Sequence, residues 1–177
     1  MSLTPLSWPE GFRTVHARAV GSYRSGKTSP TGMFTPEEES FLGSIGCTPR
    51  ELFDLVEDYC DAGEPTPEEA FEMASLRRDY LTKVQGGKVS GRRVSMEELP
   101  AKSAEAAGIR WLPRIIVKAR AKLRGEMPPE LMYGCGGDRP FLASVHFTLP
   151  EFLRLVWEKG EDTDAIVDAV RARAGRR

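Results

Sequence analysis

The amino-acid sequence predicts an all-α protein, a compact helical molecule built from two tandem related units with pseudo-twofold packing. Apolar positions recur when the 177-residue chain is compared with itself at an offset of 100 residues. The recurrence pairs residues 12–23 with 112–123, 41–45 with 141–145, and 48–56 with 148–156. Self-similarity of this kind indicates a tandem duplication.

Helix ends are marked along the whole chain, and no segment alternates apolar and polar residues convincingly. Ser or Thr followed three residues later by Glu fits the capping box that starts a helix. This pattern occurs at Ser7/Glu10, Thr35/Glu38, Thr48/Glu51 and Thr148/Glu151. Several apolar runs end in glycine, as left-handed C-caps require. The predicted helices span residues 8–24, 36–45, 49–62, 67–84, 110–124, 138–145, 149–159 and 164–174.

The chain length suits one compact domain that needs no metal or disulfide to support its core. We expect a single domain over residues 1–177. Within it, the repeat units cover about 7–85 and 99–177, joined by a linker near 86–98. Residues 89–94 are the best strand candidate, as a small hairpin or an extended linker.

Composition excludes several classes of protein. No apolar run is long enough to cross a bilayer, and the N-terminus lacks the layout of a secretory signal, so a cytoplasmic location without membrane association is expected. The three cysteines contain no Cys-x-x-Cys pair and only two histidines are present, so we predict no metal site and no cofactor. Residues 35–72 carry twelve acidic side chains and one basic, whereas residues 77–124 carry thirteen basic and four acidic.

Residues Gly21–Thr28 match the phosphate-loop pattern G-x-x-x-x-G-K-T. That loop binds phosphates only where it follows a strand and opens a helix. Here Pro30 and Gly32 follow at once, so a polar connection is the favoured interpretation and a nucleotide loop the alternative.

A glycine-rich segment around Cys135 is the main catalytic candidate. Its glycines permit close approach to a ligand, and Cys135 is a candidate nucleophile with Tyr133, Asp138 or His146 as its partner. The alternative is a tight turn in which Asp138 caps the next helix and the thiol is inert.

Basic residues recur every four positions from Arg110 to Lys122, with Arg120 and Arg124 as a neighbouring pair. On a helix they form a cationic stripe suited to phosphate or carboxylate. We take Arg114 and Lys118, with Arg139 beyond the glycine loop, as candidate anion contacts. Pairing with an acidic stripe elsewhere, or simple solvation, is the alternative.

His16 lies on the apolar face of the first predicted helix, at the position of Ile116 in the repeat. A buried imidazole with satisfied hydrogen bonds is expected there. Trp8, Trp111 and Trp157 are expected to anchor the core.

Several motifs of the second half are typical of one family. They are Leu112-Pro113-Arg114, Lys118-Ala119-Arg120-Ala121, Gly125, Tyr133, Cys135, Asp138-Arg139 and Phe141-Leu142, with Pro100 and Ser103 upstream. In these motifs residues 99–160 resemble the bacterial domain-of-unknown-function family 5069. The first half looks like a diverged copy, with Phe34, Thr35 and Glu38 near the places of Tyr133, Cys135 and Asp138. The resemblance implies a small helical bacterial protein and no particular activity.

Two functions remain open from the sequence. The first is non-catalytic binding of a small anionic ligand or a partner protein between the two halves. The second is an enzyme that uses Cys135 in thiol or acid-base chemistry. Nucleic-acid binding is the weakest idea, and a homodimer is left open.

Overall fold

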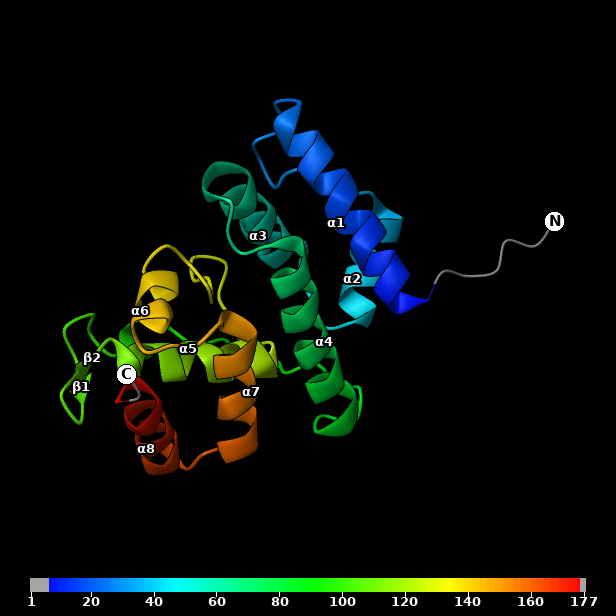
Figure 1. The fold of residues 1–177 in the computed structure, drawn as a ribbon. Helices are drawn as coiled ribbons and strands as arrows, with labels where there is room; N and C mark the ends of the chain where they lie inside the picture. The colour runs from blue at the N-terminus through cyan, green and yellow to red at the C-terminus, as the bar shows by residue number, and fades with distance from the viewer. Residues whose placement is uncertain (1–6, 176–177) are drawn as a thin grey trace. The chain divides into compact units, whose positions relative to one another are not determined.

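The computed structural model describes residues 7–175, which contain eight α-helices and one two-stranded sheet. The predicted helical fold is therefore confirmed (Figure 1). The chain divides into two units, residues 1–78 and 79–177, with the boundary inside helix α4. The first unit contains α1 (Trp8–Arg24), α2 (Pro36–Ser44), α3 (Pro49–Ala62) and most of α4 (Pro67–Lys83).

The second unit begins with the end of α4. A 3-10 turn, η1, and a two-stranded hairpin come before its four helices. Its elements are η1 (Met96–Glu98), β1 (Glu105–Ala106), β2 (Ile109–Arg110), α5 (Leu112–Arg124), α6 (Asp138–Ser144), α7 (Leu149–Lys159) and α8 (Thr163–Ala174). Of the two alternatives for residues 89–94, the hairpin is wrong, because that segment is irregular, as an extended linker would be. The hairpin lies at 105–110, where Gly108 takes a φ of 75° in the turn.

Within the first unit, α1 packs along α3 (Figure 1). Phe12 and Ala19 from α1 and Leu52 and Val56 from α3 are almost fully buried. These positions follow helical spacing, so each helix places one apolar stripe in the core.

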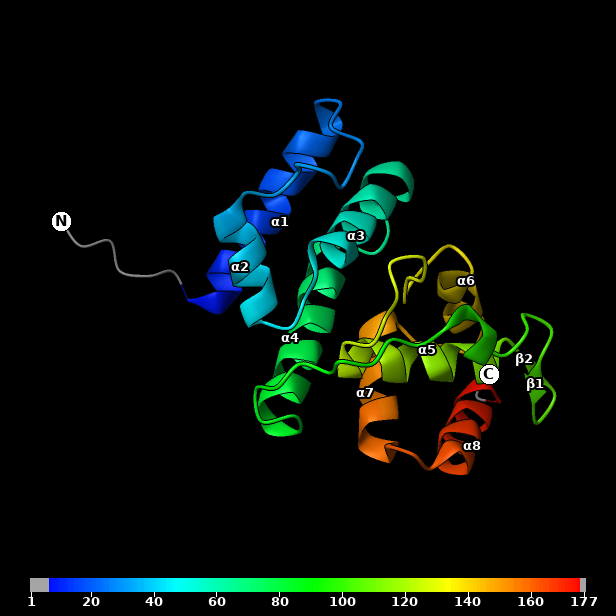
Figure 2. The ribbon, with the colours of Figure 1, turned by 180° about the vertical axis from the view of Figure 1, so that it is seen from behind.

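Within the second unit, α5 packs on α7, and α7 on α8 (Figure 2). Its core includes Leu112 and Ile115 from α5, Phe152 from α7 and Ile166 from α8. Each unit therefore has the same helix order: a long helix, a loop, a short helix and two further helices.

The turns after α2 and α6 have the same hydrogen bonds. Cys47 N donates to the carbonyl of Leu42, and Phe147 N donates to that of Leu142, both at 2.9 Å. The residue after each C-cap residue has a left-handed backbone conformation, with a φ of 77° at Gly46 and 62° at His146. Both turns therefore close their helix with the same C-cap geometry.

The phosphate-loop match at Gly21–Thr28 lacks the context that its chemistry needs. Helix α1 runs through the first part of the match and ends at Arg24. No helix begins between there and Pro36, and Nζ of Lys27 donates to the carbonyl of Gly32 at 3.1 Å. The segment is therefore a polar connection between α1 and α2, and Lys27 is hydrogen-bonded within that connection.

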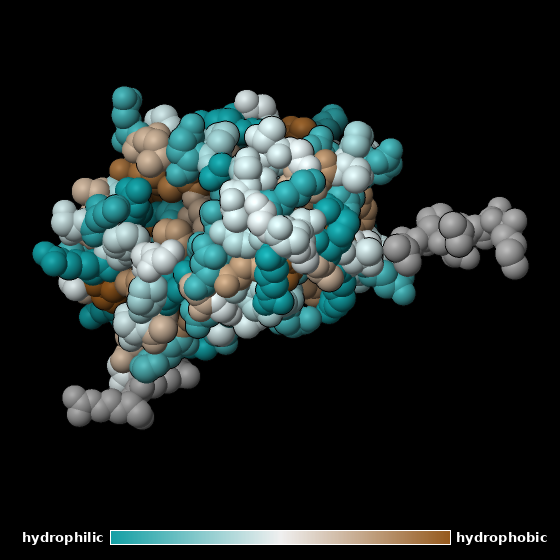
Figure 3. Space-filling model, turned by 90° about the horizontal axis from the view of Figure 1, so that it is seen from above, coloured by the Kyte–Doolittle hydropathy of each residue, from teal (hydrophilic) through white to brown (hydrophobic). Residues whose placement is uncertain are grey.

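Large hydrophobic side chains are mostly buried. In the described part of the chain, the exposed large hydrophobic residues are Val84, Val89 and Met96. Figure 3 shows one face of the molecule, on which hydrophobic surface occurs as small patches among hydrophilic side chains. Within residues 7–175, no helix has both the length and the apolar composition that a membrane crossing requires.

Candidate functional site

The structure brings three of the predicted site residues together in the second unit. Lys118 on α5 forms an ion pair with Asp138 on α6, and the two side chains are 2% and 0% exposed. Nζ of Lys118 also lies 3.3 Å from Sγ of Cys135. Burial at this level is sustained only when each charge is paired and hydrogen-bonded.

Asp138 has further partners in the surrounding loop. It accepts hydrogen bonds from the backbone N of Gly134 and from Nε1 of Trp111, both at 2.9 Å. A Cβ on Gly137 would lie only 2.6 Å from the Trp111 ring. The space left by the absent side chain of Gly137 is therefore filled by the ring of Trp111 and not left open for a ligand.

Tyr133 and His146 differ in their surroundings. The Tyr133 hydroxyl donates to the carbonyl of Leu149 at 2.8 Å, and burial together with nearby Asp138 raises the pKa of Tyr133 well above its ordinary value. His146 is exposed at the end of α6 and, within residues 7–175, has no hydrogen bond to Cys135. The loop therefore supplies a thiol beside an ammonium group, without a histidine base.

The three predicted anion contacts all have partners within the chain. Arg114 donates to the carbonyl of Pro100 at 2.9 Å, and Arg139 donates to that of Gly134 at 2.8 Å. Lys118 is held by Asp138, as described above. Arg114 and Arg139 each connect a helix to a loop, and Lys118 connects α5 to α6. A role of these cations in ligand binding stays a prediction. No group of acidic, histidine and cysteine side chains in the described residues is arranged to hold a metal ion.

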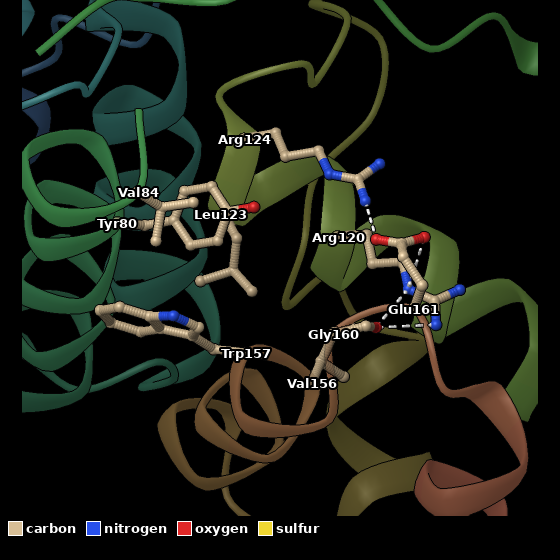
Figure 4. A pocket seen from close by; sticks show the side chains of 9 residues that line it. All are labelled: Tyr80, Val84, Arg120, Leu123, Arg124, Val156, Trp157, Gly160 and Glu161. Atoms are coloured by element: carbon tan, nitrogen blue, oxygen red, sulfur yellow. Dashed lines mark hydrogen bonds and ion pairs between the residues drawn. The ribbon is translucent and has the colours of Figure 1, made fainter. Parts of the chain in front are cut away.

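A pocket elsewhere in the second unit combines cationic and aromatic groups (Figure 4). We call it the Trp157 pocket, and its volume is about 240 Å³. Its lining residues come from the end of α4, from α5, and from α7 with the turn that follows. They are Tyr80, Val84, Arg120, Leu123, Arg124, Val156, Trp157, Gly160 and Glu161.

Arg120 and Arg124 form one side of the Trp157 pocket, with Glu161 between their guanidinium groups (Figure 4). Arg120 is 17% exposed and donates to the carbonyl of Gly160 at 2.9 and 3.1 Å. Arg124 is 31% exposed and pairs with Glu161, whose own side chain is 73% exposed. Burial alone would lower the pKa of Arg124, but a hydrogen bond with Tyr80 and the Glu161 carboxylate raise it. The two guanidinium groups are therefore half-buried, while their acidic partner is largely exposed to solvent.

Aromatic side chains form the opposite side. The rings of Tyr80 and Trp157 meet edge to face, with centroids 5.6 Å apart. Val84, which is 53% exposed, extends the apolar wall (Figure 4). Trp157 is half-buried and lines a pocket, so the expectation that it only anchors the core is corrected.

A second hollow of about 250 Å³ shares Arg120, Arg124 and Glu161 with the Trp157 pocket. Arg92 contributes a third guanidinium group there and pairs with the buried Glu126 at 3.1 Å. Glu161 therefore lines both the Trp157 pocket and this second hollow.

Sequence reasoning identified Arg120 and Arg124 as neighbours on one helix face but missed the pocket. Their spacing was visible in the sequence, whereas the approach of Tyr80 to Trp157 depends on tertiary packing. The signal that could have found the site is the pair Gly160-Glu161, which ends α7 within reach of both arginines.

Comparison of the chain with protein-family models, curated proteins and solved structures found no match. The function must therefore be argued from the residues themselves.

Proposed function

We propose that the chain is a non-catalytic binder of a small anionic ligand, which occupies the Trp157 pocket. The anionic group would bind Arg120 and Arg124 in place of Glu161, and a planar apolar part would lie against Trp157. The observation that carries the proposal is the pair of half-buried guanidinium groups whose acidic partner is 73% exposed. A carboxylate or phosphate accepts paired hydrogen bonds from arginine, which makes arginine well suited to such ligands.

The pocket dimensions restrict the ligand to a small molecule. Its volume of about 240 Å³ is below the range of roughly 300–1,000 Å³ common for drug-sized ligands. One aromatic ring with one acidic group fits this description. Phenyl phosphate, benzoate and inorganic phosphate are therefore suitable probes.

Titration calorimetry of the whole chain tests the proposal. We expect phenyl phosphate to bind more tightly than inorganic phosphate, because only the former contacts Trp157. Arg124→Gln should weaken binding about tenfold or more, since it removes a charged hydrogen-bond donor. Arg110→Gln, at an exposed arginine paired with Glu105 outside the pocket, is the matched control and should change little.

Glu161→Gln separates ligand binding from a purely structural role of the arginines. Removal of the competing carboxylate should strengthen phenyl phosphate binding about two- to fivefold, the range expected from an exposed ion pair. Weaker binding in this variant, or no binding of any probe to the native chain, would count against the pocket. A partner protein is the alternative occupant, and a flat response to all three probes would favour it.

The second candidate function is an enzyme that uses Cys135. It is supported by the contact of 3.3 Å between the thiol and the Lys118 ammonium group, since a nearby cation favours the thiolate. The rate of alkylation of Cys135 against pH decides this case. If Cys135 reacts only at the alkaline pH typical of an unperturbed cysteine thiol, the enzyme hypothesis has no support.

We also infer that the two units arose by duplication and retain a pseudo-twofold relation. At the offset of 100 residues, Arg18–Glu38 in the first unit corresponds to Lys118–Asp138 in the second. The matching turns at Gly46 and His146 support the same inference. We also propose that residues 99–160 belong to the domain-of-unknown-function family 5069. This membership would not indicate any particular activity.

A further inference from the structure

The first unit contains a pocket that neither the sequence interpretation nor the proposed function uses. We call it the His16 pocket. It lies along α1, beside Tyr59 of α3 and the first residues of α4, and its volume is about 480 Å³. Phe12, Ala17 and Val20 contribute apolar surface. A volume of this size accommodates a small organic molecule.

His16 lines this pocket beside the charged residues Arg13, Arg24 and Glu68. Its side chain belongs to a residue that is 3% exposed, and its Nε2 atom has no hydrogen-bond partner among residues 7–175. The expectation of a satisfied imidazole is therefore wrong. An unpaired buried polar atom is costly, so its presence calls for a reason.

Packing does not require a histidine here. The corresponding position in the second unit is Ile116, which is 1% exposed and serves the core without a polar atom. Retention of an imidazole at a site where isoleucine also fits indicates that its nitrogen has a partner outside the chain.

Burial lowers the pKa of His16, which favours the neutral imidazole. A neutral imidazole offers one donor and one acceptor nitrogen. It therefore suits an uncharged polar group, such as a hydroxyl, better than it suits a bare charge.

The charged residues of the pocket already have partners. Arg13 pairs with Glu68 at 3.0 Å and also lies 3.7 Å from the centre of the Phe71 ring. The exposed Arg24 lies 5.7 Å from the centre of the Tyr59 ring. A ligand carboxylate beside His16 would be buried without a dedicated cation, which is unfavourable.

We propose that the His16 pocket binds a small aromatic molecule with one uncharged hydroxyl group, and that a small rotation of the buried imidazole brings its Nε2 atom to that hydroxyl. The ring of the ligand packs among Phe12, Val20 and Tyr59. The centroids of Phe12 and Tyr59 lie 6.1 and 6.3 Å from that of His16, so aromatic surface borders the imidazole on two sides. The site is independent of the Trp157 pocket.

The test uses p-cresol, toluene and p-toluate with the whole chain, read by proton NMR of the histidine rings. Only two histidines are present, so the His16 signals are assigned directly by comparison with a His146 variant. We expect p-cresol to shift the His16 resonances and to bind about tenfold more tightly than toluene, which lacks the hydrogen bond. Charged p-toluate should bind this site more weakly than p-cresol.

Two variants complete the experiment. His16→Ile should remove the advantage of p-cresol over toluene while leaving toluene binding in place. Ala17→Phe, at an exposed position on the pocket wall, should block both probes, and Ala143→Phe on α6 is the matched control. Equal affinities for p-cresol and toluene in the native chain would overturn the proposal. So would a His16 signal that no probe moves, because Nε2 would then serve only a bound water.

Discussion

At the scale of single residues, each unit contains an ion pair between two of its helices, and the two pairs differ in burial. Arg18 and Glu38 form an ion pair whose side chains are 36% and 15% exposed. In the second unit, the side chains of the Lys118–Asp138 pair are 2% and 0% exposed. Both pairs link the long first helix of a unit to its short second helix. Because exposed charges are screened by water, the same linkage has different energetic consequences in the two units.

Removal of Lys118 should be strongly destabilising. Lys118→Met leaves the Asp138 carboxylate buried with only neutral donors, so we expect the free energy of unfolding to fall by about 3–5 kcal/mol. Arg18→Met, at the more exposed ion pair of the first unit, should cost about 1 kcal/mol or less. Urea denaturation followed by circular dichroism measures both.

Lys88→Met, at an exposed lysine in the irregular segment after α4, is the control for loss of a charge. It should change stability by less than about 0.5 kcal/mol. If Lys118→Met lowered the free energy of unfolding by less than about 1 kcal/mol, the Lys118–Asp138 pair would not be a major contributor to the stability of the second unit.

At the scale of helices, the sequence predicted the features that depend on a few neighbouring residues and missed those that do not. Capping boxes act within four residues, so α3 and α7 begin at their predicted first residues. The hydroxyls of Thr48 and Thr148 accept the expected hydrogen bonds from the backbone N of Glu51 and Glu151. The hairpin at 105–110 was missed because its strands are only two residues long and carry no period. His146 was considered as a base because sequence distance does not reveal that it caps α6 in a left-handed conformation.

The ends of α2 and α6 allow a matched stability experiment. His146 has a φ of 62° and is exposed, so His146→Gly relieves backbone strain without loss of packing and should stabilise by up to about 1 kcal/mol. Gly46→Ala imposes the same strain on the first unit and should destabilise by about 1 kcal/mol. The midpoint of urea denaturation reports both changes.

Gly43→Ala supplies the opposite control. Gly43 lies inside α2, and a Cβ added there would have no atom within 4 Å, so alanine should stabilise by about 0.5–1 kcal/mol. If Gly46→Ala behaved like Gly43→Ala, the left-handed conformation of Gly46 would be contradicted.

At the scale of the whole chain, the candidate sites depend on contacts between distant segments. The Trp157 pocket needs the end of α4 beside α7, and the His16 pocket needs α1 beside Tyr59 of α3. Apolar periodicity predicts which face of a helix is buried but not which helix covers it. The sequence therefore predicted some of the residues that line the sites, such as the pair Arg120 and Arg124. It could not predict the pockets themselves.

Helix α4 makes a further prediction about cooperativity. It contributes the buried Met73 to the first unit and the buried Leu81 to the second, and it continues without a break across their boundary. Unfolding of either unit therefore frees one end of a helix that the other unit needs. We expect the chain to unfold as one cooperative body, as the single domain predicted over residues 1–177 requires.

Hydrogen exchange read by mass spectrometry tests this coupling. In Lys118→Met, the slowest amides of α1 and α3 should lose protection by the same factor as those of α5 and α7, at least about a hundredfold. The distant helices contain no altered residue, so only cooperative unfolding carries the effect to them. Loss confined to residues 79–177 would instead identify two independently stable domains, and each pocket would then belong to a module able to bind its ligand without the other.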